Sequence, residues 1–195
     1  KDISVTLKKG DVLLIVGSSG SGKSTLMALL VGLISPKKGQ ALINNEDAKT
    51  AFPKFAHEIA YVGPEAYLIP GTVRENLLYA HPNPSTVPDQ KIWESLKLMT
   101  LDSVVRQLPN KLEENLMEHA QLSTGQKQRL SLTRALLRNP ELLLLDEATA
   151  NLDSQNEQMI ISSLSEKIPS MITVIISHKN SFDKLTDKVI RLEGN

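Results

Sequence analysis

The sequence lacks cysteine entirely and carries no excess of either charge, and both absences restrict what the protein can be. Without cysteine among its 195 residues, it forms no disulfide and no zinc or iron–sulfur site held by thiolates. Its 22 basic and 22 acidic side chains give a formal net charge of zero, so no overall basic field favours nucleic acid or an anionic membrane. We therefore expect no nucleic-acid partner.

Long apolar runs are absent as well. The run at residues 142–145 is among the longest and is far too short to cross a bilayer, and no signal-like segment opens the sequence. We expect the isolated chain to be soluble. Its length is sufficient for one well-buried domain but not for two domains of ordinary size.

The most informative feature that is present is a glycine-rich loop between an apolar run at residues 12–16 and a helical pattern at residues 26–30. The spacing fits G-x-x-x-x-G-K-[ST], in which backbone N–H groups cradle phosphates, Lys23 reaches the β- and γ-phosphates and Ser24 ligates Mg²⁺. A flexible turn would not require Lys23 and Ser24 at fixed offsets. The predicted nucleotide-binding residues here are Gly17, Ser18, Ser19, Gly20, Ser21, Gly22, Lys23, Ser24 and Thr25.

An acidic pair follows a second apolar run. Residues 142–145 are typical of a strand buried on both faces, and this strand would deliver Asp146 and Glu147 at its carboxyl end, where ligands of open α/β sheets bind. We expect Asp146 to join the magnesium shell and Glu147 to orient or deprotonate the attacking water. The plainer alternative is an acidic N-terminus of the next helix.

The alternation of strand and helix patterns predicts an α/β fold. We expect a half-buried strand at residues 3–8 and further strands near 12–16, 41–43, 59–62, 142–145, 172–176 and 189–192, with helices at 23–33 and 154–167. Between them, residues 72–137 show helical spacing, which opens on a capping box from Thr72 to Glu75. The prediction is a P-loop NTPase core with a β-layer and an inserted helical subdomain.

Four motifs together resemble the nucleotide-binding domain of an ABC transporter. Residues 122–126, Leu-Ser-Thr-Gly-Gln, are similar to the LSGGQ signature of that family, with Thr124 in place of a glycine. Residues 127–136 match its signature helix, residues 146–153 match its Walker B and D-loop segment, and His178 falls where its switch histidine lies. The resemblance covers residues 1–195.

This resemblance implies a single ABC ATPase domain, with residues 1–71 and 138–195 as the ATP-binding core and residues 72–137 as the helical subdomain. We expect the N-terminal part of the family domain to be absent, because the usual adenine-stacking aromatic residue is missing from residues 1–16.

Ser123 and Gln126 also form an S-x-x-Q capping box, and a capped helix N-terminus is the plain interpretation of the signature. Such an N-terminus is equally an anion site. The resemblance implies that the signature covers the γ-phosphate held by a second molecule and that Asp153 lies at the same composite site. His178 would then be catalytic beside Glu147. The implied nucleotide-contacting residues of the signature are Ser123, Thr124, Gly125 and Gln126.

One departure from the family lies after the predicted strand at residues 59–62. Pro64 stands where the family carries the Q-loop glutamine, and proline has no side-chain oxygen to offer a metal or water. We hypothesise that Glu65 or an extra water completes the metal shell. The apolar residues 66–69 are either local core or a groove for a membrane subunit. The basic residues of the signature helix, Lys127, Arg129, Arg134 and Arg138, are expected on a mostly solvated face.

The resemblance implies a Mg-dependent ATPase that uses ATP and Mg²⁺ and drives transport. Residues 71–76, Gly-Thr-Val-Arg-Glu-Asn, resemble the exporter branch. Implied partners are a second nucleotide-binding domain, identical or paralogous, and a transmembrane domain, fused or separate, at the cytoplasmic face of a membrane. Two alternatives remain: a non-catalytic ATP-binding half of an asymmetric pair, for which Pro64 and Thr124 argue, and a soluble ABC ATPase not linked to transport.

Overall fold

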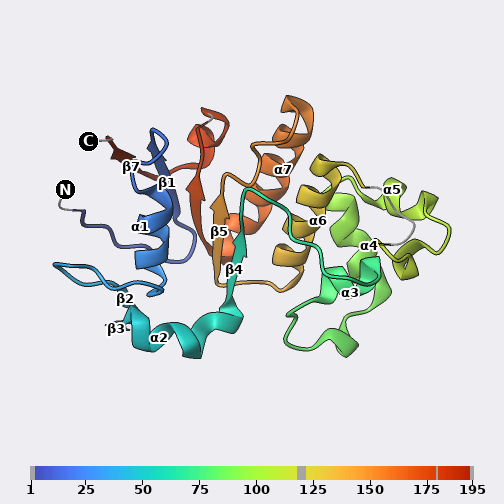
Figure 1. Cartoon of the computed structure of the whole chain (residues 1–195), viewed down its shortest axis with the longest axis horizontal. Coiled ribbons are helices and arrows are strands. Elements are labelled where there is room, and N and C mark those ends of the chain that lie inside the picture. The colour runs from blue at the N-terminus through green and yellow to red at the C-terminus, as the bar shows by residue number, and fades with distance from the viewer. Residues whose placement is uncertain (1–2, 118–121, 179, 194–195) are drawn as a thin grey trace.

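A parallel β-sheet forms the centre of the molecule. The computed structural model describes residues 3–117, 122–178 and 180–193. The five strands of the sheet are arranged in the order β4-β5-β6-β1-β7, and every neighbouring pair is parallel (Figure 1). Their bounds are Val12–Gly17 for β1, Ile59–Val62 for β4, Leu142–Asp146 for β5, Ile172–Ile176 for β6 and Lys188–Leu192 for β7.

The central strands are mostly apolar because both faces of the sheet are covered. In β1, Val12 and Leu14 belong to one hydrophobic cluster, whereas Leu13 and Ile15 belong to another. Successive side chains of a strand point to opposite faces, so the two clusters are the two sides of the sheet.

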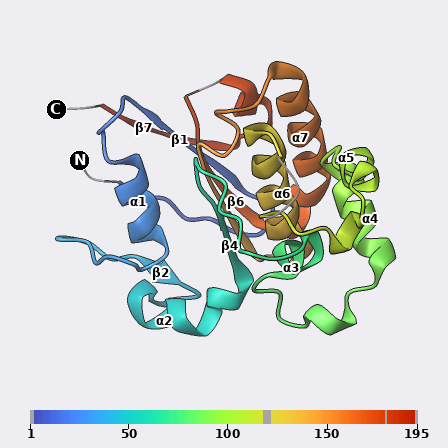
Figure 2. The same ribbon diagram turned by 45° about the vertical axis from the view of Figure 1, so that its right-hand side comes forward.

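Helices cover the two faces unequally (Figures 1 and 2). On one face, α1 (Lys23–Leu30) contributes Met27, and Phe52 of α2 (Ala48–Phe55) packs against the same cluster. The other face carries more helices, whose buried aliphatic side chains form one cluster with β4 and β5. These helices are α3 (Val73–Leu78), α4 (Asp89–Leu98), α5 (Asp102–Gln107), α6 (Thr124–Leu137) and α7 (Ser154–Lys167).

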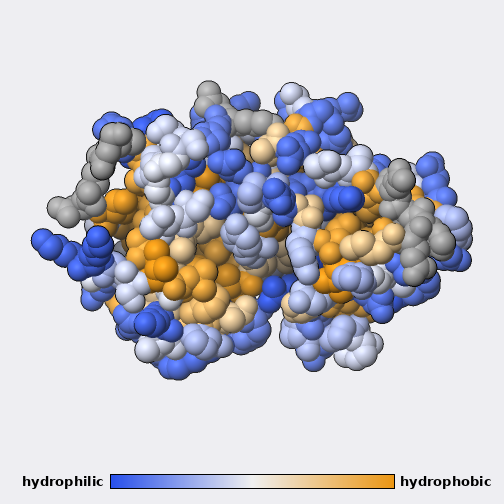
Figure 3. All heavy atoms as spheres, viewed as in Figure 1, coloured by the Kyte–Doolittle hydropathy of each residue, from blue (hydrophilic) through white to orange (hydrophobic). Residues whose placement is uncertain are grey.

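Apolar side chains gather on the thinly covered face. Figure 3 shows them between α1 and β4, and the partly buried residues there include Leu26, Leu30 and Ile59. Short 3-10 helices lie at Ala56–Glu58, Pro84–Thr86, Lys111–Glu113, Ile168–Ser170 and Asn180–Leu185.

Helix α3 begins as the sequence predicts. At α3, the Glu75 amide donates to the Thr72 hydroxyl at 3.1 Å and the Glu75 carboxylate accepts from the Thr72 amide at 2.7 Å. This capping box fixes the start of α3. Buried leucines of α3, α4 and α6 share one cluster with the sheet. The division at residues 72 and 137 stays a prediction.

The predicted strand at residues 3–8 is wrong: this segment is irregular and pairs with no strand among the described residues. Its alternation instead reflects packing, because Val5 and Leu7 lie against the cluster that contains Leu13. An alternating pattern needs a neighbouring strand to satisfy its backbone before it becomes a sheet element.

A two-stranded hairpin replaces the single short strand expected at residues 41–43. In it, β2 (Leu42–Ile43) pairs antiparallel with β3 (Glu46–Asp47). The two connecting residues, Asn44 and Asn45, have φ of 51° and 64°. Consecutive positive φ values belong to a tight hairpin turn, and asparagine tolerates them well. The Asn-Asn pair is the sequence signal for the second strand.

The signature helix α6 is buried rather than mostly solvated, which corrects the expectation for its arginines. Arg129 donates to the carbonyl oxygens of Met99 and Thr100 at 3.1 Å each, and Arg138 donates to the His57 carbonyl at 3.0 Å. Lys127 is exposed, as expected. The arginines are held inward because α6 lies between the sheet and the outer helices, where unpaired carbonyls at segment ends need donors.

Leu96 of α4 tests the larger core. Leu96→Ala should lower the free energy of unfolding by about 2–5 kcal/mol, because the side chain is fully buried and its removal leaves a cavity. Leu33→Ala is the control, since that side chain is 62% exposed and should cost less than about 0.5 kcal/mol. Urea unfolding measures both, and equal losses would contradict the assignment of the core.

The ion pair between Asp11, just before β1, and Lys188 of the edge strand β7 can be tested by the stability of the protein in acid. The Lys188 ammonium, 2.6 Å from Asp11, lowers the pKa of this carboxyl below the ordinary 3.8. The pair therefore stabilises the fold above about pH 4, and that stabilisation is lost as pH falls through the lowered pKa. Asp11→Asn should flatten the acid limb of stability against pH. Lys188→Met should flatten it less, because the Lys8 amide still donates to the Asp11 carboxylate at 2.9 Å, and an unchanged limb in both variants would refute the pairing.

Candidate functional site

The glycine-rich loop connects β1 to α1 as the sequence predicts. Gly20 and Gly22 have φ of 78° and 95°, and Gly22 is the N-cap of α1. Only glycine adopts such angles freely, so these two positions shape the loop. The Lys23 ammonium donates to the carbonyl oxygens of Gly17 and Ser18 at 3.0 Å each. The loop is thus wrapped around the lysine at a helix N-terminus, which is an anion-binding arrangement.

Ser24 and Asp146 lie together although 122 positions separate them in the sequence. The Ser24 hydroxyl donates to Asp146 Oδ2 at 3.0 Å. The pairing follows from the sheet, since β1 and β5 both flank β6 and end at the same edge. Tyr61 of β4 donates its hydroxyl to the same carboxylate oxygen at 3.4 Å. Burial and the Asp146 charge raise the pKa of Tyr61 above its ordinary value.

This donor set fits magnesium. Mg²⁺ takes oxygen ligands and is usually held in phosphate sites by one or two carboxylates, with phosphates and waters completing the shell. Ser24 and Asp146 supply a hydroxyl and a carboxylate beside the loop. Within the described parts of the chain, no group of three or more histidine, cysteine or acidic residues forms a self-sufficient metal cage. Ser24 and Asp146 would therefore hold the ion together with the nucleotide's phosphates.

Glu147 and His178 also meet at this edge. His178 Nε2 lies 2.9 Å from Glu147 Oε1. The Glu147 backbone has φ of 52°, an angle that is strained for a residue with a side chain, and its amide donates to the Ile176 carbonyl at 3.0 Å. Strained angles persist where the surroundings impose them, often at functional sites. The bend after β5 turns the Glu147 carboxylate towards His178, which follows the neighbouring strand β6.

The signature residues open α6. Ser123 and Gln126 form the predicted capping box, with bonds of 3.2 Å and 2.8 Å between their side chains and backbone amides. A side chain at Gly125 would begin 3.3 Å from Leu152 Cδ2, so the signature packs closely on the segment after Glu147. Thr124 is exposed at the first position of α6.

Asp153 is placed as the N-cap of α7. Its carboxylate accepts from the Asn156 amide at 2.9 Å, and this backbone bond lowers the pKa of Asp153 below its ordinary value. The structure thus gives Asp153 a helix-capping role. Its contact with a nucleotide, like the roles predicted for the loop, the signature, Asp146, Glu147 and His178, remains a prediction.

The segment after β4 contains interactions that the sequence did not reveal. The Gln128 amide of α6 donates to the Gly63 carbonyl at 2.8 Å, and Asn151 donates to the Pro64 carbonyl at 3.4 Å. Glu65 is exposed. The bond from Tyr61 to Asp146 was missed too, because neither the 57% exposure of the Tyr61 side chain nor its contact with β5 can be seen in the sequence.

A groove of about 400 Å³ lies beside this segment. It is lined by residues of β4 and α6 and of the segments that follow β4 and α3, among them Ala60, Val62, Pro64, Ser131 and Ala135. Of the apolar residues at 66–69, Leu68 packs on the core whereas Tyr67 is 69% exposed. The core interpretation thus holds for Leu68, and a groove for a membrane subunit stays a prediction.

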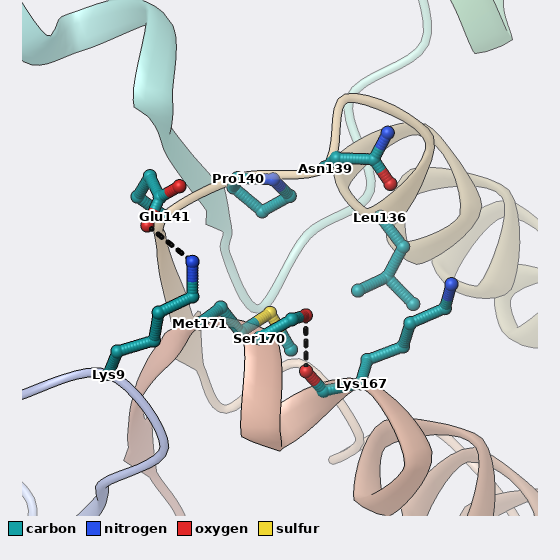
Figure 4. A pocket seen from close by; sticks show the side chains of 8 residues that line it. All are labelled: Lys9, Leu136, Asn139, Pro140, Glu141, Lys167, Ser170 and Met171. Atoms are coloured by element: carbon teal, nitrogen blue, oxygen red, sulfur yellow. Dashed lines mark hydrogen bonds and ion pairs between the residues drawn. The ribbon is translucent and has the colours of Figure 1, made fainter.

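A second hollow lies far from this chemistry. It has a volume of about 300 Å³ and is lined by Lys9, Glu141, Lys167 and Met171, among others (Figure 4). Lys9, Glu141 and Met171 precede β1, β5 and β6, so this hollow is at the amino ends of the strands. Ligands of open parallel sheets bind at the carboxyl ends, where the glycine loop, Asp146 and His178 lie.

Comparison with known proteins places the chain in a family. The ABC transporter family matches residues 1–150, more than half of the chain. The chain belongs to the ABC transporter family. An ABC transporter ATP-binding/permease protein from Haemophilus influenzae is 36% identical over 195 residues, covering 99% of this chain and 35% of the relative. A multidrug resistance ABC transporter ATP-binding and permease protein from Lactococcus lactis is 34% identical, covering 99% and 33%.

A solved structure supports the same family assignment. This ABC domain is similar to a bacterial Atm1-family ABC exporter with ATP bound, with a TM-score of 0.82, 28% identity, and coverage of 94% of this chain and 32% of that one. The predicted P-loop NTPase fold and the resemblance to exporter-type members are confirmed. The chain spans about a third of the length of these relatives. Among the described residues, no helix combines the length and apolarity that crossing a membrane requires.

Proposed function

We propose that this ABC domain hydrolyses Mg-ATP and that the free energy drives export through a membrane domain. The observation that carries the proposal is the 2.9 Å contact between Glu147 and His178 at the sheet edge where Ser24 bonds Asp146. A base candidate, its histidine partner and a metal-binding pair thus lie at the mouth of one phosphate loop.

Each residue has a distinct role in this proposal. Backbone amides of residues 17–25 bind the phosphates, with Lys23 neutralising the β- and γ-phosphates. Ser24 and Asp146 hold Mg²⁺, which when bound supplies charge stabilisation for phosphoryl transfer. Glu147 orients or deprotonates the attacking water, and His178 holds the Glu147 carboxylate and would hydrogen-bond the γ-phosphate or the water.

The complete site requires a second nucleotide-binding domain, identical or paralogous. Ser123, Thr124, Gly125 and Gln126 open α6 with exposed or half-buried positions. A helix N-terminus favours an anion, so this end would cover the γ-phosphate bound to the other copy, with Asp153 nearby. The domain would be a single unit with core residues 1–71 and 138–195 and a helical subdomain at 72–137.

The remaining partner is a transmembrane domain, fused or separate, which would place this chain at the cytoplasmic face of a membrane. The groove between β4 and α6 would receive it, since Tyr67 leaves a large apolar ring exposed at its rim. Relatives named as ATP-binding and permease proteins support a membrane partner.

A non-catalytic ATP-binding role is the second candidate, and Pro64 and Thr124 favour it. Proline offers no oxygen to the metal site, and the threonine side chain adds bulk where a close backbone approach to phosphate is expected. The intact pair of Glu147 and His178 favours catalysis.

Glu147→Gln tests the catalytic proposal. The amide keeps the size of the side chain but removes the base, so steady-state ATP hydrolysis should fall by about 100-fold or more while ATP binding persists. Glu166→Gln, an exposed position of α7, is the matched control. Turnover is measured by phosphate release from the purified chain at several concentrations. Equal turnover in the Glu147 variant and an active parent chain would refute Glu147 as the base, whereas no turnover in the parent chain would support the non-catalytic candidate.

Mixing two inactive variants tests the composite site. Thr124→Glu would repel a phosphate, yet a carboxylate in the first turn of α6 favours the helix itself. Mixed with Glu147→Gln, it yields heterodimers in which one of the two sites has both an intact Glu147 and an intact Thr124.

We expect each variant alone to be inactive and the mixture to recover about a quarter of normal turnover, from random pairing of two subunits. Phosphate release at increasing protein concentration is the measurement. No recovery at any concentration, with folding of both variants verified by unfolding curves, would argue against the shared site.

A further inference from the structure

Asp146 accepts two hydroxyl groups on one oxygen, and only one of them belongs to the phosphate loop. Ser24 donates at 3.0 Å, and Tyr61 donates at 3.4 Å, both to Oδ2. Among the described residues, these are the side chains that bond this carboxylate. A tyrosine from β4 therefore reaches the centre of the proposed metal site.

The backbone explains how Tyr61 reaches this position. β4 pairs in parallel with β5, and Tyr61 lies opposite Leu144, two residues before Asp146. Its neighbours Ala60 and Val62 are buried in the larger cluster, so the Tyr61 side chain points to the other face of the sheet. A long side chain on that face can extend along the strand towards its carboxyl end, where Asp146 lies.

Gly63 leaves room for the ring. A Cβ atom at position 63 would lie 3.0 Å from the Tyr61 hydroxyl and 3.2 Å from its Cε1. Both separations are tighter than ordinary van der Waals contacts, so any other residue at 63 would require the ring to shift by a few tenths of an ångström. The glycine here has an ordinary φ, and space rather than backbone angle is what it provides.

Burial of the ring does not explain why a tyrosine occupies position 61. The Tyr61 side chain is 57% exposed, so its ring gains little from burial. Next in the chain, Pro64 has no side-chain oxygen, and Glu65 is exposed. The Tyr61 hydroxyl is the oxygen that β4 and the segment after it bring to Asp146.

We propose that Tyr61 is a positioning residue of the magnesium site, whose hydroxyl holds the Asp146 carboxylate and supplies beside it the neutral oxygen that Pro64 cannot. The inference rests on the proposed function, since it concerns the same Mg-ATP site. Groups that hydrogen-bond a metal ligand orient it, and their loss typically weakens metal binding about 10-fold or more.

Metal-dependent nucleotide binding tests the proposal without turnover. A fluorescent, non-hydrolysable ATP analogue is titrated with the purified chain, first in EDTA and then at increasing Mg²⁺. Tyr61→Phe keeps the ring and removes the hydroxyl alone. We expect affinity in EDTA to be unchanged and the Mg²⁺ concentration for half-maximal tightening to rise about 10-fold.

Two control variants set the lower and upper limits of the expected change in the Mg²⁺ requirement. Tyr79→Phe removes another exposed phenol hydroxyl, at the C-terminal end of α3, and should leave the Mg²⁺ requirement unchanged. Ser24→Ala removes a direct ligand and should raise it further. Equal Mg²⁺ requirements in Tyr61→Phe and the parent chain would overturn the role of Tyr61. No tightening by Mg²⁺ in the parent chain would overturn the proposed function, and this inference with it.

Gly63→Ala provides a second, independent test of the role of Tyr61. The added methyl group should displace the Tyr61 ring and raise the Mg²⁺ requirement in the parent chain. In the Tyr61→Phe background it should add little, because the hydroxyl is already gone, and such non-additivity marks a shared pathway. A full additional increase in that background would show that Gly63 acts without Tyr61 and would count against the proposal.

Discussion

The site depends on one constraint: β1, β5 and β6 are adjacent, parallel and buried on both faces. Parallel neighbours end at the same edge, so the residues that follow each strand are brought together regardless of their distance along the chain. The glycine loop follows β1, Asp146 ends β5 and His178 follows β6. The bonds from Ser24 to Asp146 and from His178 to Glu147 are consequences of that arrangement.

A second support is the buried signature helix α6, which ties the helices to the sheet by donating hydrogen bonds to carbonyl oxygens. Arg134 binds the carbonyls of Asn76 and Tyr67 at 2.6 Å and 2.9 Å, and Gln128 binds that of Gly63 at 2.8 Å. The segment between β4 and α3 is thereby attached to the helix whose N-terminus carries Ser123.

Local signals in the sequence predicted well wherever the local residues decide the structure. The capping boxes at Thr72 and Ser123 form because each satisfies backbone amides within four residues. The prediction of a strand at residues 3–8 was wrong because a strand also needs a neighbouring strand to bond its backbone, and the alternating pattern near Val5 does not show whether one is present. The prediction that the arginines of α6 are solvated was wrong for a similar reason, because helical spacing does not show that a helix is covered on both sides.

The sequence by itself determined the phosphate loop, the acidic pair, the signature helix and the α/β class, because these depend on residue order and on short-range backbone chemistry. The tertiary structure decided which side chains share Asp146, that Asp153 caps a helix and that Gly63 makes room for a ring. Such contacts join residues from different strands and helices. Their geometry is set by sheet register and packing, which no local pattern records.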